Sequence, residues 1–487
     1  MQTKRKSVRE VTETILEWEK RFPVDRIQYG KLRVWPLLRL CAILAIHQGA
    51  GLRTELPVPQ KRRKIRKGKK NAFPSFESLP EIKAGSVLFW AQSSKFVEQP
   101  EDPFFHRFFD PLLRFADEPR SDHTFWIWED GPEVGAVKPD EMVTINDWLG
   151  PLIVYARKSP PTHRLNRSGR RFLDAWNAEA DLPEIEIEAF ELTCHKISIW
   201  AKFFEQCLEF SRPNGVILTC FYAELTMALT LACSRLAIPC VELQHGQQGN
   251  WHSMYTHWSK VPRKGYDLIP DQFWMWGEAA ADRVRSWLRG PSRKVFVGGN
   301  PWLAWRVKTS IGDRKTGGLI FPEQNSAIGR TILISLQFSE LPDFVWDTIA
   351  RRRCDCWLLR LHPRFLADES SFIAECEKRL PHGNWEVERS SRADFYDVLT
   401  QVDIHVTGWS TTAYEALAFD VPTILIDPNG LDAMRGSIDE GVFGYSDDEE
   451  SFSELLDTPP AKREEKPTMI SDSREVLAAW NSCRSAR

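Results

Sequence analysis

Residues 215–246, GVILTCFYAELTMALTLACSRLAIPCVELQHG, decide the fold class of this chain. An apolar run at 215–221 predicts a strand, the apolar spacing at 223–236 predicts a helix, and 239–243 predicts a second strand. Strands that are apolar along their whole length, joined by a helix, are typical of a parallel sheet covered by helices on both faces. The stretch therefore predicts an α/β domain.

The same alternation extends in both directions and occurs twice. Further strands are predicted at 86–91, 124–128, 331–337, 356–361, 384–388, 403–407 and 422–426. Helices are predicted at 8–21, 35–47, 104–116, 188–210, 343–353, 370–380, 392–401, 413–419 and 474–480. Neither first strand is followed by GxGxxG or a P-loop, which disfavours dehydrogenases and NTPases. We expect two Rossmann-like domains that face each other across a cleft.

The pattern divides the 487 residues into four parts. We expect residues 1–84 to form a helical, basic N-terminal extension and 85–298 to form the first Rossmann-like domain. Residues 299–445 are expected to form the second Rossmann-like domain, and 446–487 an acidic, charged linker with a C-terminal helix.

Composition excludes several classes of protein. A net charge of −3 with 42% hydrophobic residues disfavours disorder and a globally basic nucleic-acid binder. The N-terminus lacks an apolar signal region, and no apolar run approaches the ~20 residues of a membrane span. Ten cysteines without CxxC spacing indicate reduced thiols and no metal site. We expect a cytoplasmic protein without a bound cofactor.

One segment departs from this neutral balance. The run KRRKIRKGKK, from Lys61 to Lys70, carries eight basic residues. It is either a solvated surface loop or a peripheral contact with anionic lipid at the inner face of the membrane, where each basic residue contributes roughly 1 kcal/mol. We expect no nucleic-acid partner.

The strongest polar cluster is GWSTTAYE, which follows the strand at 403–407. Gly408, Ser410, Thr411 and Thr412 place backbone N–H and hydroxyl groups where a strand turns into a helix, as in a phosphate site. An ordinary helix N-cap is the alternative. Glu415, one turn later, is predicted to accept hydrogen bonds from a ribose or else to lie in solvent.

RLHPR ends another apolar strand. Arg360 and His362 project to one side by strand alternation, Pro363 fixes the direction of the exit, and Arg364 adds a third cation. Such a cluster could bind a diphosphate or protonate a departing one. The alternative is a histidine that is satisfied by backbone groups.

Gln244, His245 and Gly246 end the strand at 239–243. An unperturbed histidine pKa of ~6.5 would let His245 accept a proton from an acceptor hydroxyl, and Gly246 would allow a sharp turn or a close ligand approach. A histidine satisfied by backbone groups is again the alternative. Tryptophans beside these loops could stack on a sugar or a base: Trp251, Trp258, Trp274, Trp276, Trp302, Trp305 and Trp409.

A second candidate base lies earlier in the chain. Glu129 and Asp130, followed by Gly131, come directly after the strand at 124–128, where a carboxylate could do the same work. Asp-Gly is also a common turn pair. Both interpretations stay open.

Residues 240–430 resemble the GT-B glycosyltransferase-like proteins of bacterial capsule and lipopolysaccharide synthesis, which are related to bacterial sialyltransferases, Kdo transferases and CDP-glycerol glycerophosphotransferases. The segments that carry the resemblance are QHG, PDQFWMWGE (270–278), VGGNPWL (297–303), RLHPR and TGWSTTAYEALAFDVPTILID (407–427). The resemblance covers about 40% of the chain, and the N-terminal extension matches no motif.

The resemblance implies roles for individual residues. The HP motif and the S-S/T motif of the sialyltransferase-like proteins imply that His362 with Pro363, and Ser410 with Thr411, hold the donor phosphates. Their acidic motif supplies the base and is matched by Glu129, Asp130 and Gly131. The HG motif of the glycerophosphotransferases lies on the acceptor side and is matched by His245. Gln244, Gly246 and Asn300 are assigned to the acceptor side of the cleft.

These expectations combine into one function, with 85–298 as the Rossmann-like acceptor domain and 299–445 as the Rossmann-like nucleotide-donor domain. We expect a metal-independent, inverting glycosyltransferase that moves a sugar or a glycerophosphate-like unit from a CMP-, CDP- or UDP-linked donor to a surface polysaccharide or glycolipid. The alternatives are a nucleotide-sugar 2-epimerase on the same fold and a non-catalytic GT-B-like subunit of a polysaccharide assembly machine.

Overall fold

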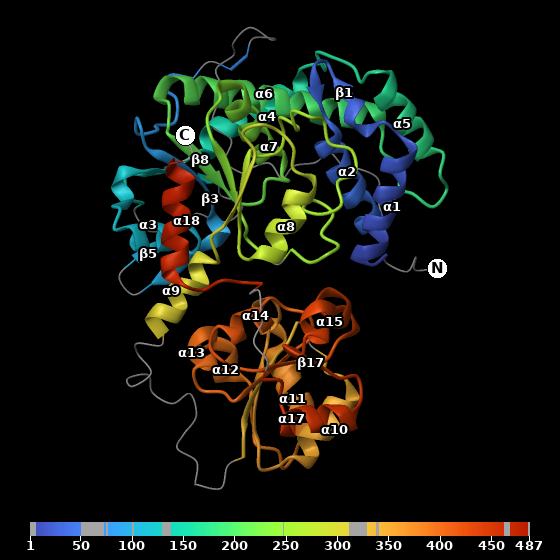
Figure 1. The fold of residues 1–487 in the computed structure, drawn as a ribbon, viewed down its shortest axis with the longest axis vertical. Coiled ribbons are helices and arrows are strands. Elements are labelled where there is room, and N and C mark those ends of the chain that lie inside the picture. Colours follow the sequence, from blue (N-terminus) through green and yellow to red (C-terminus); the bar gives the residue numbers. More distant parts are fainter. Residues whose placement is uncertain are drawn as a thin grey trace. The chain divides into compact units, whose positions relative to one another are not determined.

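The computed structural model describes residues 6–49, 73–74, 76–99, 102–128, 138–246, 248–310, 329–337, 340–461 and 468–485 (Figure 1). The chain forms two compact units. The first comprises Met1–Trp276, Ala280–Gly298 and Leu477–Arg487, and the second comprises Gly277–Ala279 and Gly299–Val476. None of the helices within the described ranges is both long enough and apolar enough to cross a membrane.

Among its described residues, the first unit contains a parallel sheet of seven strands in the order β11-β10-β9-β8-β3-β6-β7. The strands are β3 (Val87–Gln92), β6 (Thr124–Trp128), β7 (Met142–Thr144), β8 (Gly215–Leu218), β9 (Cys240–Leu243), β10 (Gln272–Met275) and β11 (Lys294–Val297). Because all pairs are parallel, the carboxyl ends of the strands lie along one edge.

Helices cover both faces of this sheet. They include α3 (Phe109–Ala116), α4 (Asn146–Lys158), α6 (Ile187–Ser211), α7 (Glu224–Leu236), α8 (Glu278–Trp287) and part of α18 (Ser473–Ser485). Helix α5 (Arg167–Asn177) packs instead against the N-terminal extension. Trp90 of β3 joins the large core that includes α6 and α7. Its neighbour Phe89 faces the other way, 4.8 Å from the ring of Phe109 in α3 and stacked on Trp480 of α18. Burial on both faces explains the continuously apolar strands.

The N-terminal extension is part of the first unit. Helices α1 (Val8–Arg21) and α2 (Trp35–Gln48) are joined through a hairpin of β1 (Gln28–Tyr29) and β2 (Leu32–Arg33). A capping box between Ser7 and Glu10 starts α1, and Gly49, with φ +60°, ends α2. Trp18 of α1 packs on Phe172 and Trp176 of α5. The described residues of the extension therefore share the core of this unit.

Among the described residues of the second unit, six parallel strands follow the order β14-β13-β12-β15-β16-β17. They are β12 (Thr331–Ser335), β13 (Cys356–Arg360), β14 (Trp385–Glu386), β15 (Ile404–Thr407), β16 (Thr423–Leu425) and β17 (Phe443–Tyr445). Helices α10 (Asp343–Arg351), α11 (Glu369–Arg379) and α17 (Glu449–Asp457) pack on the face that carries Ile334, Val406 and Ile424. The two Rossmann-like sheets confirm the predicted fold class.

The remaining elements show where the sequence prediction was incomplete. The unpredicted elements include α4, α5, β10, α8, β11 and α9 (Pro301–Ser310). The helix predicted at 104–116 begins only at Phe109, because Asp102–His106 forms β5, which pairs with β4 (Phe96–Gln99). The helix predicted at 392–401 is shorter, as α13 (Phe395–Leu399), because Asp394 caps its start, and the preceding helix α12 (Glu388–Arg392) was not predicted. Short helices α14 (Thr412–Leu417), α15 (Pro428–Ala433) and α16 (Arg435–Asp439) complete the second unit.

Candidate functional site

In the first unit, Gln244 ties the ends of two neighbouring strands together. Its backbone N–H donates to Trp274 O (3.0 Å), its Oε1 accepts from Trp276 N (2.8 Å), and its Nε2 donates to Gly246 O (2.9 Å). The side chain is buried. Gln244 therefore shapes the loop that carries His245, and this placement does not support a direct acceptor contact.

His245 lies beside a buried carboxylate at the end of β9. Its Nδ1 is 3.4 Å from Glu242 Oε1, and its side chain is 16% exposed whereas that of Glu242 is fully buried. The carboxylate also accepts from Phe221 N (2.8 Å) and from the Tyr255 hydroxyl. Both oxygens of Glu242 thus accept hydrogen bonds, and the carboxylate lies where it can stabilise a positive charge on the His245 ring.

Cys220 adds a strained backbone to this cluster. It adopts φ +58° at the end of β8, a left-handed conformation uncommon for a residue with a side chain. Its backbone N–H donates to Glu242 Oε1 (3.2 Å) and to His245 Nδ1 (3.2 Å), so Nδ1 acts as an acceptor in this arrangement. Burial raises the pKa of the Cys220 thiol to about 12, so the thiol stays neutral. The strained turn thus serves to aim a backbone donor at the Glu242–His245 pair.

Tyr222 connects two histidines. Its Oη lies 3.4 Å from Nε2 of His245 and 3.4 Å from Nε2 of His252. Burial lowers the pKa of His252 to about 4 and raises the pKa of Tyr222, so both are neutral near pH 7. Sequence reasoning missed Glu242, Tyr222 and His252. The available signal was a glutamate inside the otherwise apolar strand PCVEL.

The N-terminal extension holds the loop that supplies His252 and Tyr255. The hydroxyl of Thr12 in α1 contacts both Trp251 O and Ser253 Oγ at 2.7 Å. The buried carboxylate of Glu19 accepts from Ser259 N (2.9 Å). The extension, which matches no motif, therefore has a structural role next to the candidate base.

Two sequence predictions fall outside the described residues. One is the acidic motif of Glu129, Asp130 and Gly131, and the other is the basic run from Lys61 to Lys70. The rival base and the membrane contact remain predictions.

In the second unit, His362 and Pro363 lie after β13 on the surface. His362 begins the short 3₁₀ helix η4 (Pro363–Asp368), and its Nδ1 accepts from Arg364 N (3.2 Å). Partial burial and the nearby Arg364 guanidinium lower the pKa of His362, so the ring is neutral near pH 7. With Nδ1 as acceptor, the proton lies on Nε2, which can donate to an anion.

Gln337 brings two motif loops together. Its backbone oxygen accepts from Arg364 Nη2 (2.6 Å), and its Oε1 accepts from Trp409 N (2.6 Å). A Cβ on Gly408 would lie 2.8 Å from Gln337 Oε1, so a side chain at this position would displace the Gln337 amide. The loops after β12, β13 and β15 therefore meet, as the sequence pattern predicted for the last two. The linking residue, Gln337, was not identified from sequence.

The hydroxyl groups of Ser410, Thr411 and Thr412 belong to half-buried residues at this edge of the sheet. Ser410 Oγ accepts from Thr412 N (3.3 Å), which closes a turn before α14. Glu415 is only 8% exposed, and its Oε2 accepts from the Tyr396 hydroxyl (3.1 Å). Its carboxylate contacts this tyrosine instead of lying in solvent, so the ribose contact remains a prediction.

Arg360 is committed to backbone carbonyls. Its Nη1 donates to Ser390 O and to Ala393 O (2.8 Å), and its guanidinium lies 5.6 Å from the Phe395 ring. Burial lowers its pKa. Arg360 therefore braces the α12–α13 turn, and this placement does not support the predicted phosphate contact.

Asn300 and most of the selected tryptophans also have structural roles. Asn300 is buried, and its Oδ1 accepts from Trp302 N (3.1 Å) and Leu303 N (3.3 Å) at the start of α9. It is a helix cap, which does not support an acceptor contact. Buried packing positions are occupied by Trp258, Trp274, Trp276 and Trp302. Trp409, 38% exposed, remains available for stacking.

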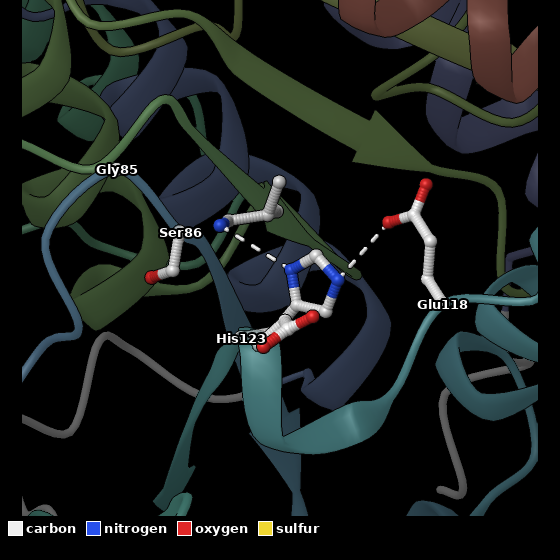
Figure 2. Close-up of a pocket in the computed structure, with 6 residues that line it drawn as sticks. Gly85, Ser86, Glu118 and His123 are labelled. Carbon is white, nitrogen blue, oxygen red and sulfur yellow. Dashed lines mark hydrogen bonds and ion pairs between the residues drawn. The ribbon is translucent and has the colours of Figure 1, made fainter.

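A polar cavity of about 270 Å³ lies elsewhere in the first unit (Figure 2). His123 lies between Val87 N, 3.4 Å from Nδ1, and Glu118 Oε2, 3.1 Å from Nε2. Val87 and His123 lie at the amino ends of β3 and β6, whereas ligands of such sheets bind at the carboxyl ends. Within the described ranges, no group of three or more His, Cys, Asp or Glu side chains could hold a metal ion.

No protein-family model and no curated protein matches this sequence. Solved structures do match. UDP-GlcNAc 2-epimerase from Neisseria meningitidis, bound to UDP-GlcNAc, aligns with a TM-score of 0.50 at 12% identity, covering 82% of this chain and 99% of that one. UDP-GlcNAc 2-epimerase from Methanocaldococcus jannaschii gives 0.49 at 13% identity, with coverage of 82% and 99%. The calicheamicin glycosyltransferase CalG4 gives 0.41 at 14% identity, with coverage of 83% and 95%. The chain has the GT-B fold.

Proposed function

We propose that this protein is a glycosyltransferase-like enzyme that transfers a sugar, or a glycerophosphate-like unit, from a nucleotide-activated donor to a hydroxyl of a polysaccharide or glycolipid. The observation that carries the proposal is the partly exposed His245, backed by the buried Glu242 at the carboxyl edge of the first sheet. The motif resemblance to capsule and lipopolysaccharide enzymes supports the acceptor class. A cytoplasmic location, with the Lys61–Lys70 run against anionic lipid, belongs to the same proposal.

In the proposed reaction, the imidazole of His245 takes the proton of the attacking hydroxyl, and the nearby carboxylate of Glu242 stabilises the positive charge that forms on the ring. For a sugar donor, the new bond joins that oxygen to the anomeric carbon as the bond from this carbon to the donor phosphate oxygen breaks, and the electron pair stays on the phosphate. A direct displacement of this kind inverts the configuration. For a glycerophosphate-like unit, the new bond joins the oxygen to the transferred phosphorus as the bond from this phosphorus to the nucleotide phosphate oxygen breaks.

Negative charge then develops on the departing phosphate, where the second unit supplies donors. The His362 Nε2–H and the hydroxyls of Ser410, Thr411 and Thr412 are assigned to its oxygens. Donors fixed in advance at developing charge contribute the largest catalytic effect in many enzymes. The scheme uses no metal ion.

Nucleotide binding tests the assignment of the second unit. His362→Ala and Ser410→Ala each remove one phosphate donor, so we expect each to weaken nucleotide affinity about tenfold, as for a hydrogen bond to a charged group. A thermal-shift panel of CMP, CDP, UDP and GDP identifies the nucleotide, and titration calorimetry measures its affinity. Unchanged affinity in both variants would contradict the phosphate assignment. No shift of the native protein by any nucleotide would favour a non-catalytic subunit.

Gly246 tests the acceptor side. A Cβ added to Gly246 meets no atom within 4 Å, and the residue does not have a positive φ, so Gly246→Ala costs the fold little. We expect an unchanged melting temperature and a raised KM for the acceptor, since the methyl group would occupy space next to His245. An unchanged KM would show that no acceptor approaches this glycine.

A nucleotide-sugar 2-epimerase is the second candidate. The buried carboxylate of Glu242 at the end of a strand in the first unit is the feature that favours it, because epimerisation requires proton removal from a sugar carbon. Incubating the protein with UDP-GlcNAc alone separates the two functions. A change of configuration at C2 without any acceptor would establish the epimerase, whereas release of nucleotide that depends on an acceptor would establish transfer.

A further inference from the structure

Four side chains form a connected polar row across the sheet of the second unit. His405 of β15 is at its centre, with Nδ1 3.1 Å from Thr423 Oγ1 and Nε2 2.7 Å from Ser335 Oγ. Ser335 Oγ lies 3.4 Å from Thr412 Oγ1 at the start of α14. The row lies on the opposite face from Ile334, so it is separate from the apolar core there.

The protons in this row can be placed from burial. His405 is fully buried, and burial lowers its pKa to about 3, so the ring is neutral and carries one proton. Thr423 is also fully buried, and among the described residues its hydroxyl contacts only His405 Nδ1. A buried hydroxyl that does not donate is costly. Thr423 therefore donates to Nδ1, and the imidazole proton lies on Nε2.

The direction of the remaining bonds follows. The Nε2–H of His405 donates to Ser335 Oγ, so the proton of Ser335 is directed to Thr412 Oγ1, its other contact in the described part of the chain. At 3.4 Å this last link is longer than an ordinary O–H···O bond and is the weakest of the three. Thr412, as an acceptor from Ser335, keeps its own proton for a group outside the row.

We propose that this row is a positioning device that orients the Thr412 hydroxyl as a donor to a phosphate oxygen of a bound nucleotide. The inference rests on the proposed function and extends it, because it assigns roles to three residues inside the sheet. His405, Ser335 and Thr423 are positioning residues, and only Thr412 contacts the ligand. A hydroxyl that is held as a donor binds a group that can only accept, such as a phosphate oxygen, better than it binds an uncharged group of the ligand.

The test compares a nucleotide with its own nucleoside. The nucleotide is whichever of CMP, CDP, UDP and GDP binds the native protein most tightly, and titration calorimetry gives both dissociation constants. In Ser335→Ala and in Thr412→Val, we expect the preference for nucleotide over nucleoside to fall by threefold to tenfold, the range of one hydrogen bond. Thr407→Val is the matched control. This variant removes a buried hydroxyl that lies next to the row but is not part of it, and that donates to Ser335 O (3.0 Å). It should leave the preference for nucleotide over nucleoside unchanged.

Two further comparisons decide the outcome. The double variant Ser335→Ala/Thr412→Val should lose no more preference than Thr412→Val alone, since both changes interrupt the same row. Additive losses, or an unchanged preference in Thr412→Val, would overturn the positioning role while leaving nucleotide binding intact. A native protein that binds none of the four nucleotides would overturn the proposed function and this inference together.

Discussion

His245→Ala should reduce transfer by about 10²–10⁴-fold, the range expected for the loss of a general base, while nucleotide affinity stays at the native value. The imidazole is in the first unit, at the end of β9, whereas the groups assigned to phosphate are in the second unit. Loss of the base therefore affects the chemical step and not donor binding. The measurement is nucleotide release in the presence of an acceptor, alongside calorimetry on the same preparation.

Asp130→Ala is the control that distinguishes the two candidate bases. If His245 is the base, Asp130→Ala keeps most of the activity. Retained transfer in His245→Ala together with loss in Asp130→Ala would move the base to the acidic motif at Glu129 and Asp130. A weakened nucleotide affinity in His245→Ala would contradict the division of roles between the units.

The parts of the candidate site that could be predicted from sequence are those with a local signal. His362, Ser410 and His245 each lie directly after an apolar strand, and parallel strands bring such positions to one edge. The strand-helix alternation that reveals the edge also reveals the fold class. These inferences need only neighbouring residues.

The parts that could not be predicted depend on contacts between distant segments. Glu242 and His245 are close because both lie at the end of the same strand, three residues apart. Tyr222 and His252 reach this pair from other loops. Gln337 links the loops of Arg364 and Trp409 through its backbone oxygen and its side-chain oxygen. Contacts of this kind produce no recognisable sequence pattern. Arg360 matched a phosphate ligand in residue type, yet its guanidinium is directed to carbonyls inside the unit.

The N-terminal extension presents the same difficulty in another form. Its helices were predicted correctly, but their partners could not be, because Thr12 and Glu19 contact residues about 240 positions later. The extension contains a buried ion pair between Glu19 and Arg39, both with fully buried side chains. Glu19 also accepts from Trp35 Nε1 (2.9 Å), and Arg39 Nη2 donates to Thr256 O (3.0 Å).

Glu19→Ala should therefore lower the free energy of unfolding by about 3–5 kcal/mol, the cost of leaving a buried charge without its partner. Arg39 cannot lose its proton, and its guanidinium would remain buried against Trp258 without the carboxylate. Urea unfolding measures the change. Glu13→Ala is the control, because it breaks the Arg9–Glu13 pair on the exposed side of the same helix, with side chains 59% and 47% exposed.

The double variant Glu19→Leu/Arg39→Met separates the charge from the packing. It buries no charge, so we expect it to be more stable than Glu19→Ala despite two substitutions. A loss in Glu19→Ala no larger than that in Glu13→Ala would contradict the buried pair. Glu19 and Arg39 both hold the loop that carries His252 and Tyr255. Glu19→Ala should therefore also reduce the transfer activity, even when it is assayed at a temperature at which this variant is folded. Glu13→Ala should not reduce it.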